Sequence, residues 1–248
     1  MPKIREERIE FLRHLFLKCL PSEADAFARS RFDEGERTVG LLNSKFPELF
    51  SRGKPRVLEL GSGNGGMLFP FALGAHAVAL DTYIDADLRR FAALSGLSIG
   101  HVRATASALP FRSNSLDVVL MAEVIEHLPQ PRKAAREVMR VLRSGGVCLI
   151  STPPRLKFLT RRDPHFGIPS LVALPDPLQR LIAARIANKR HAYVHHIYAT
   201  TWGIRRLFPS GSATMHVISH RRDWTRHLSW NYVAFQKTCK QPSLAGQP

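Results

Sequence analysis

Hydrophobic positions change their spacing along this chain, and the changes divide it into three parts. In the first fifty residues they recur every three or four positions, as at Ile9, Leu12 and Phe16, which predicts helices. From Arg56 onward, short apolar runs alternate with helical segments. After Ser151, repeated prolines interrupt the pattern, so that part cannot form one continuous helix.

The hydrophobic pattern of the middle part is typical of an α/β fold. Its apolar runs have no polar alternation, which is typical of strands buried on both faces of a parallel sheet covered by helices. We expect these strands at Val57–Leu60, Ala77–Leu80, Ile99–Arg103, Val118–Met121 and Val147–Ile150. Helices are expected at Met67–Leu73, Asp85–Ser95 and Arg132–Leu142, with a turn over 143–146.

The last part contains further elements around its prolines. Asp176 and Pro177 are a typical helix start, which predicts a helix through about Arg190 with apolar and basic positions. Two final strands are expected at Ala213–Ser219 and Tyr232–Lys237.

A glycine-rich segment joins the first strand to the next helix. Glycines at 61, 63 and 65 allow a sharp turn and let a ligand approach backbone N–H groups without Cβ atoms in the way. Asp81 ends the following strand, 20 residues after Gly61, where a carboxylate can accept hydrogen bonds from both hydroxyls of a ribose. Together they predict an adenosine-type pocket. Gly61, Gly63 and Gly66 also satisfy the dinucleotide pattern, so a dehydrogenase domain is an alternative at this point.

Four motifs, in order, resemble class I S-adenosylmethionine-dependent methyltransferases, and most closely the type 11 methyltransferase domain. They are Glu-Leu-Gly-Ser-Gly-Asn-Gly at 59–65, Leu-Pro-Phe at 109–111 with Ser-Leu-Asp-Val-Val at 115–119, Glu-His-Leu at 126–128, and Arg-Val-Leu-Arg-Ser-Gly-Gly at 140–146. A dinucleotide-dependent dehydrogenase does not explain the second and fourth motifs. The resemblance implies a seven-stranded Rossmann-like sheet, mostly parallel with the last strand antiparallel, flanked by helices, with N-terminal helices and a helical cap insert.

The resemblance also implies the residues that hold S-adenosyl-L-methionine. Asp81 would hold the ribose hydroxyls and Thr82 would lie beside the adenine. Thr105 stands where the family commonly has an acidic residue that bonds the adenine amino group, which predicts weaker cofactor binding. The full implied set is Glu59, Gly61, Ser62, Gly63, Asn64, Gly65, Asp81, Thr82, Thr105, Ala106 and Ala122.

Methyl transfer by direct displacement depends mainly on proximity, orientation and exclusion of water, and a general base is needed only for a neutral hydroxyl acceptor. The candidate bases are His127, beside the expected cofactor mouth, and His165, in the loop after the fifth strand. For each histidine, a purely structural role is the competing interpretation. No cluster with metal-ligand spacing is found, so no metal is expected.

The domain organisation follows from these assignments. We expect an N-terminal helical lid at 1–52, the S-adenosylmethionine-binding core at 53–154 and a helical cap or acceptor insert at 155–210. Terminal antiparallel strands at 211–240 would complete the core sheet, followed by a flexible tail at 241–248.

The charge bears on the acceptor. The 248-residue chain has a formal net charge of +16, and residues 151–248 carry 15 Lys and Arg against 3 Asp and Glu. This asymmetry predicts an anionic acceptor, or one presented on an anionic surface; a merely solvated basic face is the alternative. A small molecule or sugar is the first choice, and a lipid-linked or quinone-like acceptor at a membrane surface is the second.

RNA is the third acceptor class, favoured only by charge and by tryptophans near arginines. A non-catalytic cofactor-binding protein of the same fold is the remaining alternative, disfavoured by the intact glycine segment and Asp81. The charged N-terminus and three dispersed cysteines favour a cytoplasmic protein without disulfides, with peripheral membrane association as a variant.

Overall fold

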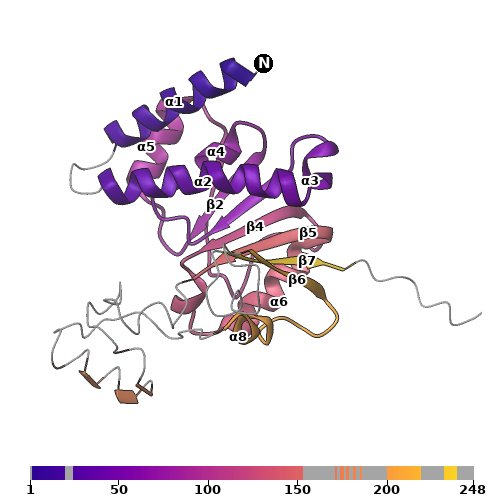
Figure 1. Cartoon of the computed structure of the whole chain (residues 1–248). Coiled ribbons are helices and arrows are strands. Elements are labelled where there is room, and N and C mark those ends of the chain that lie inside the picture. The colour runs from indigo at the N-terminus through magenta and orange to yellow at the C-terminus, as the bar shows by residue number, and fades with distance from the viewer. Residues whose placement is uncertain are drawn as a thin grey trace, which may run out of the picture.

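The structure, a computed structural model, describes residues 2–19, 25–152, 171, 174–175, 177–178, 181–182, 185, 200–218 and 232–238. The strands form one seven-stranded sheet in the order β3-β2-β1-β4-β5-β7-β6 (Figure 1). They are β1 (Arg56–Leu60), β2 (His76–Asp81), β3 (Ile99–Arg103), β4 (Leu116–Ala122), β5 (Leu142–Ser151), β6 (Ala213–Ile218) and β7 (Tyr232–Lys237).

Sheet topology confirms the expected fold class. Strands β1 to β5 pair in parallel, whereas β7 runs antiparallel to both β5 and β6. The strand order reverses between β1 and β4, and ligands of open α/β sheets bind outside the carboxyl ends of the strands at such a switch point. This edge is therefore where a functional site is expected.

Two layers of helices cover the sheet (Figure 1). The first contains α1 (Pro2–Cys19), α2 (Asp25–Lys45), α4 (Phe69–Ala72) and α5 (Ala86–Ser95), with the short α3 (Glu48–Ser51) beside them. The second contains α6 (Pro131–Val141) and α8 (Thr201–Arg205), and the 3₁₀ turn η2 (Ile125–His127) follows β4. Each layer shares a separate hydrophobic cluster with one face of the sheet.

An aromatic cluster anchors the N-terminal helices to the core. The ring of Phe16 on α1 lies 5.1 Å from that of Phe69 and 5.4 Å from that of Phe91, and 5.9 Å from that of Phe32 on α2. All four side chains are fully buried. Burial of such rings contributes about 2 kcal/mol each, so α1 and α2 are part of the folded core.

Helix α5 shows how the sequence sets an element's ends. The Asp85 carboxylate accepts hydrogen bonds from the N–H groups of Asp87 at 2.7 Å and Leu88 at 3.4 Å, which caps the first turn. Gly96, at φ +66°, ends the helix in the left-handed region that glycine adopts without strain. These ends agree with the predicted helix at Asp85–Ser95.

Two predicted boundaries differ from the structure. Helix α4 has only four residues, because the chain from Gly65 to Leu68 is held in turns by the Gly65 carbonyl. Strand β5 begins directly at Leu142, where a helix end and turn were expected. A register shift opposite Leu116 and Val118 and a positive φ of 76° at Gly145 place the glycines inside the strand as an irregularity.

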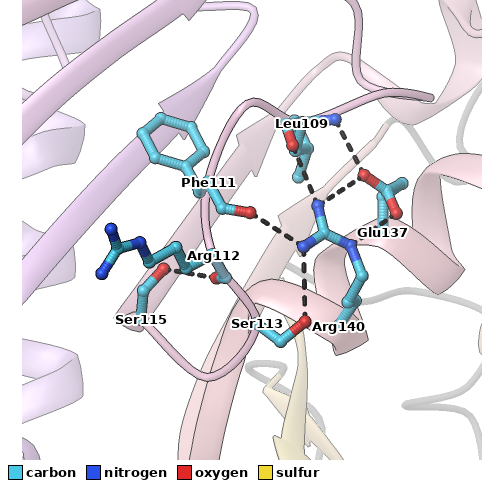
Figure 2. Close-up of polar contacts among 7 residues, drawn as sticks. All are labelled: Leu109, Phe111, Arg112, Ser113, Ser115, Glu137 and Arg140. Carbon is cyan, nitrogen blue, oxygen red and sulfur yellow. Dashed lines mark hydrogen bonds and ion pairs between the residues drawn. The ribbon is translucent and has the colours of Figure 1, made fainter.

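The second and fourth motifs meet in a polar clamp on α6 (Figure 2). The Arg140 guanidinium donates to the carbonyls of Phe111 at 2.8 Å and Leu109 at 2.9 Å, and pairs with the Glu137 carboxylate at 2.8 Å. The Leu109 N–H donates to Glu137 at 2.8 Å. Two parts of the chain about thirty positions apart are thus joined, and the loop before β4 is fixed by the start of the Arg-Val-Leu motif.

The structure also bears on the cysteines, on metal binding and on membrane-spanning helices. Cys19 and Cys148 are buried and free, and Cys239 lies outside the described residues. Within the described ranges, no group of three or more His, Cys, Asp or Glu side chains is arranged to hold a metal ion. No helix in the described part is long and apolar enough to span a membrane.

Candidate functional site

The glycine segment after β1 is tied to the end of β2. The N–H groups of Gly61 and Ser62 both donate to the Leu80 carbonyl, at 2.8 and 3.2 Å, and the Gly65 N–H donates to the Ser62 carbonyl at 2.7 Å. Asn64 accepts a hydrogen bond from the Gly66 N–H at 3.1 Å. The segment therefore forms a closed turn at the switch point of the sheet.

Three glycines of this turn have positive φ angles, but they serve different purposes. A Cβ at Gly61 would lie 2.5 Å from the Cγ2 atom of Val124, and one at Gly65 would lie 2.4 Å from the Cδ1 atom of Leu88. Side-chain packing therefore leaves no room for a Cβ at Gly61 or Gly65. A Cβ at Gly63 would have no atom within 4 Å, so the space beside this glycine is open and a ligand fits there.

Asp81, the last residue of β2, contacts this turn directly. One of its oxygens accepts from the Gly63 N–H at 3.1 Å, and the other accepts from the Thr82 N–H at 2.7 Å. The Thr82 carbonyl in turn accepts from the Arg103 side chain at 2.9 Å. The structure thus brings Gly63, Asp81 and Thr82 together, as an adenosine-type pocket requires.

Two buried polar side chains beside the turn lack hydrogen-bond partners within the described residues. Glu59 is 2% exposed with one carboxyl oxygen unpartnered, and Ser62 is 5% exposed with its hydroxyl unpartnered. Burial raises the pKa of Glu59 to about 8, although the nearby Arg31 acts in the opposite direction. Because buried polar groups are normally satisfied, these atoms indicate a polar ligand at this position.

Thr105 and Ala106 lie in the loop after β3, next to the same edge. The Ala104 N–H donates to the Asp81 carbonyl at 3.0 Å, which places the start of this loop beside the ribose-binding candidate. The exposed Thr105 hydroxyl lies 3.2 Å from that of Ser107. Ala106 is half-buried against the second hydrophobic cluster.

A carboxylate at Thr105 is expected to tighten cofactor binding about tenfold, because a charge-assisted hydrogen bond is roughly twice as strong as a neutral one. Calorimetric titration of Thr105→Asp with S-adenosylhomocysteine measures the change. Ala108→Asp, an exposed position on the same loop, is the control for a general charge effect. No gain in affinity for Thr105→Asp would contradict the assigned position.

A second set of polar residues follows β4 at the same edge. Ala122 is buried at the strand's end, and Glu123 adopts φ +57°, in the left-handed region that is unusual for a side-chain-bearing residue. Glu126 is 2% exposed, and neither of its carboxyl oxygens has a hydrogen-bond partner within the described residues. Ser151, at the end of β5, is 5% exposed and its hydroxyl is likewise unpartnered.

The pKa values of the two glutamates are raised by their surroundings. Desolvation raises the pKa of Glu126 to about 7. Glu123 is exposed, but partial desolvation of its carboxyl group, and then the negative charge of Glu126, raise its pKa to about 7, while the Ser151 side chain lowers it. Arg31 of α2, whose guanidinium pairs with Glu34 at 2.9 Å, lowers both pKa values and that of Glu59. Arg31 thus interacts electrostatically with carboxyl groups from three segments, namely α2, β1 and the loop after β4.

The two candidate bases have different outcomes. His127 is half-buried at the end of η2, where its N–H donates to the Val124 carbonyl at 2.9 Å, and it has a further interaction of its own. His165 lies outside the described residues. A role of either histidine in proton transfer stays a prediction.

The sequence interpretation missed Glu123, Glu126, Ser151 and Arg31. A signal for Glu126 was available, since it belongs to the Glu-His-Leu motif and follows a buried strand at the expected active edge. The prediction assigned the role of base to the neighbouring His127 instead of Glu126. No local pattern connects Arg31, on an N-terminal helix, with the ends of β1 and β4.

Comparison with known proteins gives these residues a family context. The family model described as "Methyltransferase domain" matches residues 58–150. The chain is 36% identical to a demethylmenaquinone methyltransferase of Clavibacter sepedonicus, over 40% of this chain and 42% of the relative. It is 28% identical to a ubiquinone biosynthesis O-methyltransferase of Chelativorans sp. (strain BNC1), over 61% of this chain and 66% of the relative. Each match spans less than two thirds of the relative's length.

A solved structure shares the fold over a longer stretch. The PH0226 protein of Pyrococcus horikoshii OT3 aligns over 82% of this chain and 91% of its own, with a TM-score of 0.56 and 19% identity. At that identity the likeness concerns the arrangement of sheet and helices. It extends the comparison beyond residues 58–150, to parts of the chain that the family model does not match.

Proposed function

Residues 58–150 form a methyltransferase domain of the type 11 family, a class I S-adenosylmethionine-dependent fold, and from this premise we propose that the protein transfers a methyl group from S-adenosyl-L-methionine to a small-molecule acceptor. The observation that carries the proposal is the glycine turn held against Asp81, with the Gly63 N–H 3.1 Å from its carboxylate and open space beside it. A catalytic role agrees with this intact cofactor edge better than a non-catalytic one does.

The residues at this edge fit the cofactor. Asp81 offers carboxylate oxygens to ribose hydroxyls, and the unpartnered oxygens of Glu59 and Ser62 suit the polar methionine portion. When bound, the cofactor supplies a methyl group activated by a sulfonium. The residues proposed to hold it are Glu59, Gly61, Ser62, Gly63, Asn64, Gly65, Asp81, Thr82, Thr105, Ala106 and Ala122.

For the acceptor, we propose a quinone-like small molecule that carries a hydroxyl group. The quinone-like ring is supported by both relatives, one named for demethylmenaquinone and one for ubiquinone biosynthesis. The hydroxyl group is supported by the second alone, which is named as an O-methyltransferase. A lipid-linked acceptor would suit the exposed Leu178 and Leu181 next to Arg185. A negative charge on the acceptor stays a prediction, tied to a basic segment that lies mostly outside the described residues.

The proposed division of the chain follows the same logic. We propose that residues 53–154 bind the cofactor and that the strands within 211–240 complete the core sheet. Residues 1–52 and 155–210 would close over the acceptor as a lid and cap. The buried aromatic contacts of α1 and α2 would give the lid a fixed base on the core.

Methyl transfer can be tested by mass spectrometry of S-adenosylhomocysteine formed with reduced demethylmenaquinone, catechol or bulk RNA as acceptor. We expect product with the small hydroxyl compounds and none with RNA. Fractionating a cell extract by size and charge extends the search to acceptors other than these three. Tight cofactor binding without turnover on any fraction would favour the non-catalytic alternative, and turnover with RNA alone would favour an RNA methyltransferase.

A further inference from the structure

Buried polar atoms without partners gather at the ends of β4 and β5. Glu126 and Ser151 are 2% and 5% exposed, and their three side-chain oxygens make no hydrogen bond of ordinary geometry within the described residues. The Thr152 side chain is near enough to Glu126 to lower its pKa, and the Ser151 hydroxyl acts on Glu123 in the same way. Leaving a buried polar group unsatisfied destabilises the fold, and more so for a charged group. A fold retains such atoms at this cost when a ligand satisfies them, so this position is a candidate ligand site.

The loop that carries Glu126 is in contact with the cofactor turn. The Val124 side chain packs so closely on Gly61 that a Cβ there would approach it to 2.5 Å. The left-handed backbone at Glu123, with φ +57°, allows the chain to turn sharply at the end of β4. Its N–H donates to the Ser151 carbonyl at 3.0 Å, which fixes the loop to β5. The unpartnered atoms therefore lie next to the place proposed for the cofactor.

We propose that Glu126 binds the hydroxyl group of the methyl acceptor and takes its proton during transfer, with the Ser151 hydroxyl as a second contact. This inference rests on the proposed function and narrows it to an oxygen acceptor that enters as a neutral hydroxyl. A hydroxyl can donate a hydrogen bond to the Glu126 carboxylate, whereas an anionic oxygen would meet repulsion from Glu123 and Glu126.

The transfer step balances with these groups. The acceptor oxygen forms a bond to the methyl carbon while the carbon–sulfur bond breaks, and the electron pair of that bond remains on sulfur. The acceptor's O–H bond breaks at the same time, and its proton moves to an oxygen of Glu126. The products are a methyl ether, S-adenosylhomocysteine and a neutral Glu126, which returns its proton to solvent before the next cycle.

Charges around Glu126 set the pH at which it can act. Glu123, on its own loop, is a carboxyl neighbour, and Arg31, on α2, is the facing cation within the described residues. Burial raises the pKa of Glu126 to about 7, so the carboxylate that accepts a proton is populated above that pH. Turnover limited by this step should rise with pH through about 7.

Substitution of Glu126 by glutamine keeps the shape and removes the base. With catechol as the acceptor, Glu126→Gln is expected to lower kcat by about 100-fold or more and to remove the rise through pH 7. Its affinity for S-adenosylhomocysteine should stay close to that of the wild type. With 4-nitrocatechol, whose hydroxyl ionises more readily, the fall in kcat caused by Glu126→Gln should be much smaller, because this acceptor has already lost its hydroxyl proton to solvent.

Two further variants separate this role from the alternatives. Asp87→Asn, in the first turn of α5, controls for the loss of one carboxylate and should leave turnover unchanged. If His127→Ala, and not Glu126→Gln, removes the rise with pH, the inference is wrong. It is also overturned if Glu126→Gln retains kcat or the pH profile of the wild type.

Binding provides a test that does not depend on turnover. In the presence of S-adenosylhomocysteine, calorimetry at pH 8 should detect catechol binding to the wild type, weaker binding to Ser151→Ala and the weakest to Glu126→Gln. Equal binding by wild type and Glu126→Gln would overturn the inference, even if methyl transfer occurs. Failure of the proposed function is read separately, from the absence of S-adenosylhomocysteine formation by the wild type with every extract fraction.

Discussion

Replacing Asp81 with alanine is expected to weaken the affinity for S-adenosylhomocysteine by about 100-fold. Two effects combine. The variant loses the carboxylate oxygens proposed to accept from the ribose hydroxyls, and it loses the contact that holds the Gly63 N–H at 3.1 Å. Calorimetric titration measures the change, and Asp87→Ala, in the first turn of α5, controls for the loss of an acidic residue nearby.

A comparison with the 2′-deoxyribose analogue separates the two effects. Wild type should bind the complete ligand more tightly than the analogue, because one hydroxyl then lacks its carboxylate partner. Asp81→Ala should bind both with similar affinity. If the variant still discriminates between them, Asp81 acts only by holding the turn, and another group binds the ribose.

The central sheet could be predicted because its information is local. Runs such as Val118–Met121 are apolar on both faces, and Asp85 and Gly96 carry the chemistry of a helix start and end within a few residues. The strand positions agree with the structure to within a few residues, except that β5 begins five residues earlier, at Leu142. There, irregular pairing with β4 overrides the local preference of the glycines for a turn.

The polar part of the site was less predictable, because it depends on contacts between distant segments. The glycine turn and Asp81 can be recognised from their spacing in the sequence. By contrast, Arg31 reaches the ends of β1 and β4 only after α2 has packed on the core, and the clamp of Arg140 and Glu137 on Leu109 requires α6 to lie beside the loop. Glu126 is buried just after the left-handed turn at Glu123, a backbone conformation that a glutamate does not predict.

The same dependence on burial makes Glu59 a source of pH-dependent stability. Its pKa is about 8 in the folded protein, against an ordinary value of 4.5, because desolvation penalises the charged form. Between these values the folded state binds more protons than the unfolded state, so the free energy of unfolding falls as the pH rises from about 4.5 to about 8. Glu126, which is also buried, acts in the same direction, and Arg31 opposes both.

Glutamine at Glu59 removes this penalty without changing the shape of the side chain. Relative to wild type, Glu59→Gln is expected to gain roughly 3–5 kcal/mol in the free energy of unfolding between pH 5 and pH 9. Urea denaturation without cofactor at a series of pH values measures the difference, and Glu48→Gln, in the short helix α3, is the control for an exposed carboxyl group. Parallel stability curves for Glu59→Gln and wild type would mean that Glu59 is not desolvated in the folded protein. The variant should at the same time bind S-adenosylhomocysteine more weakly, because it lacks the carboxyl group proposed to face the ligand.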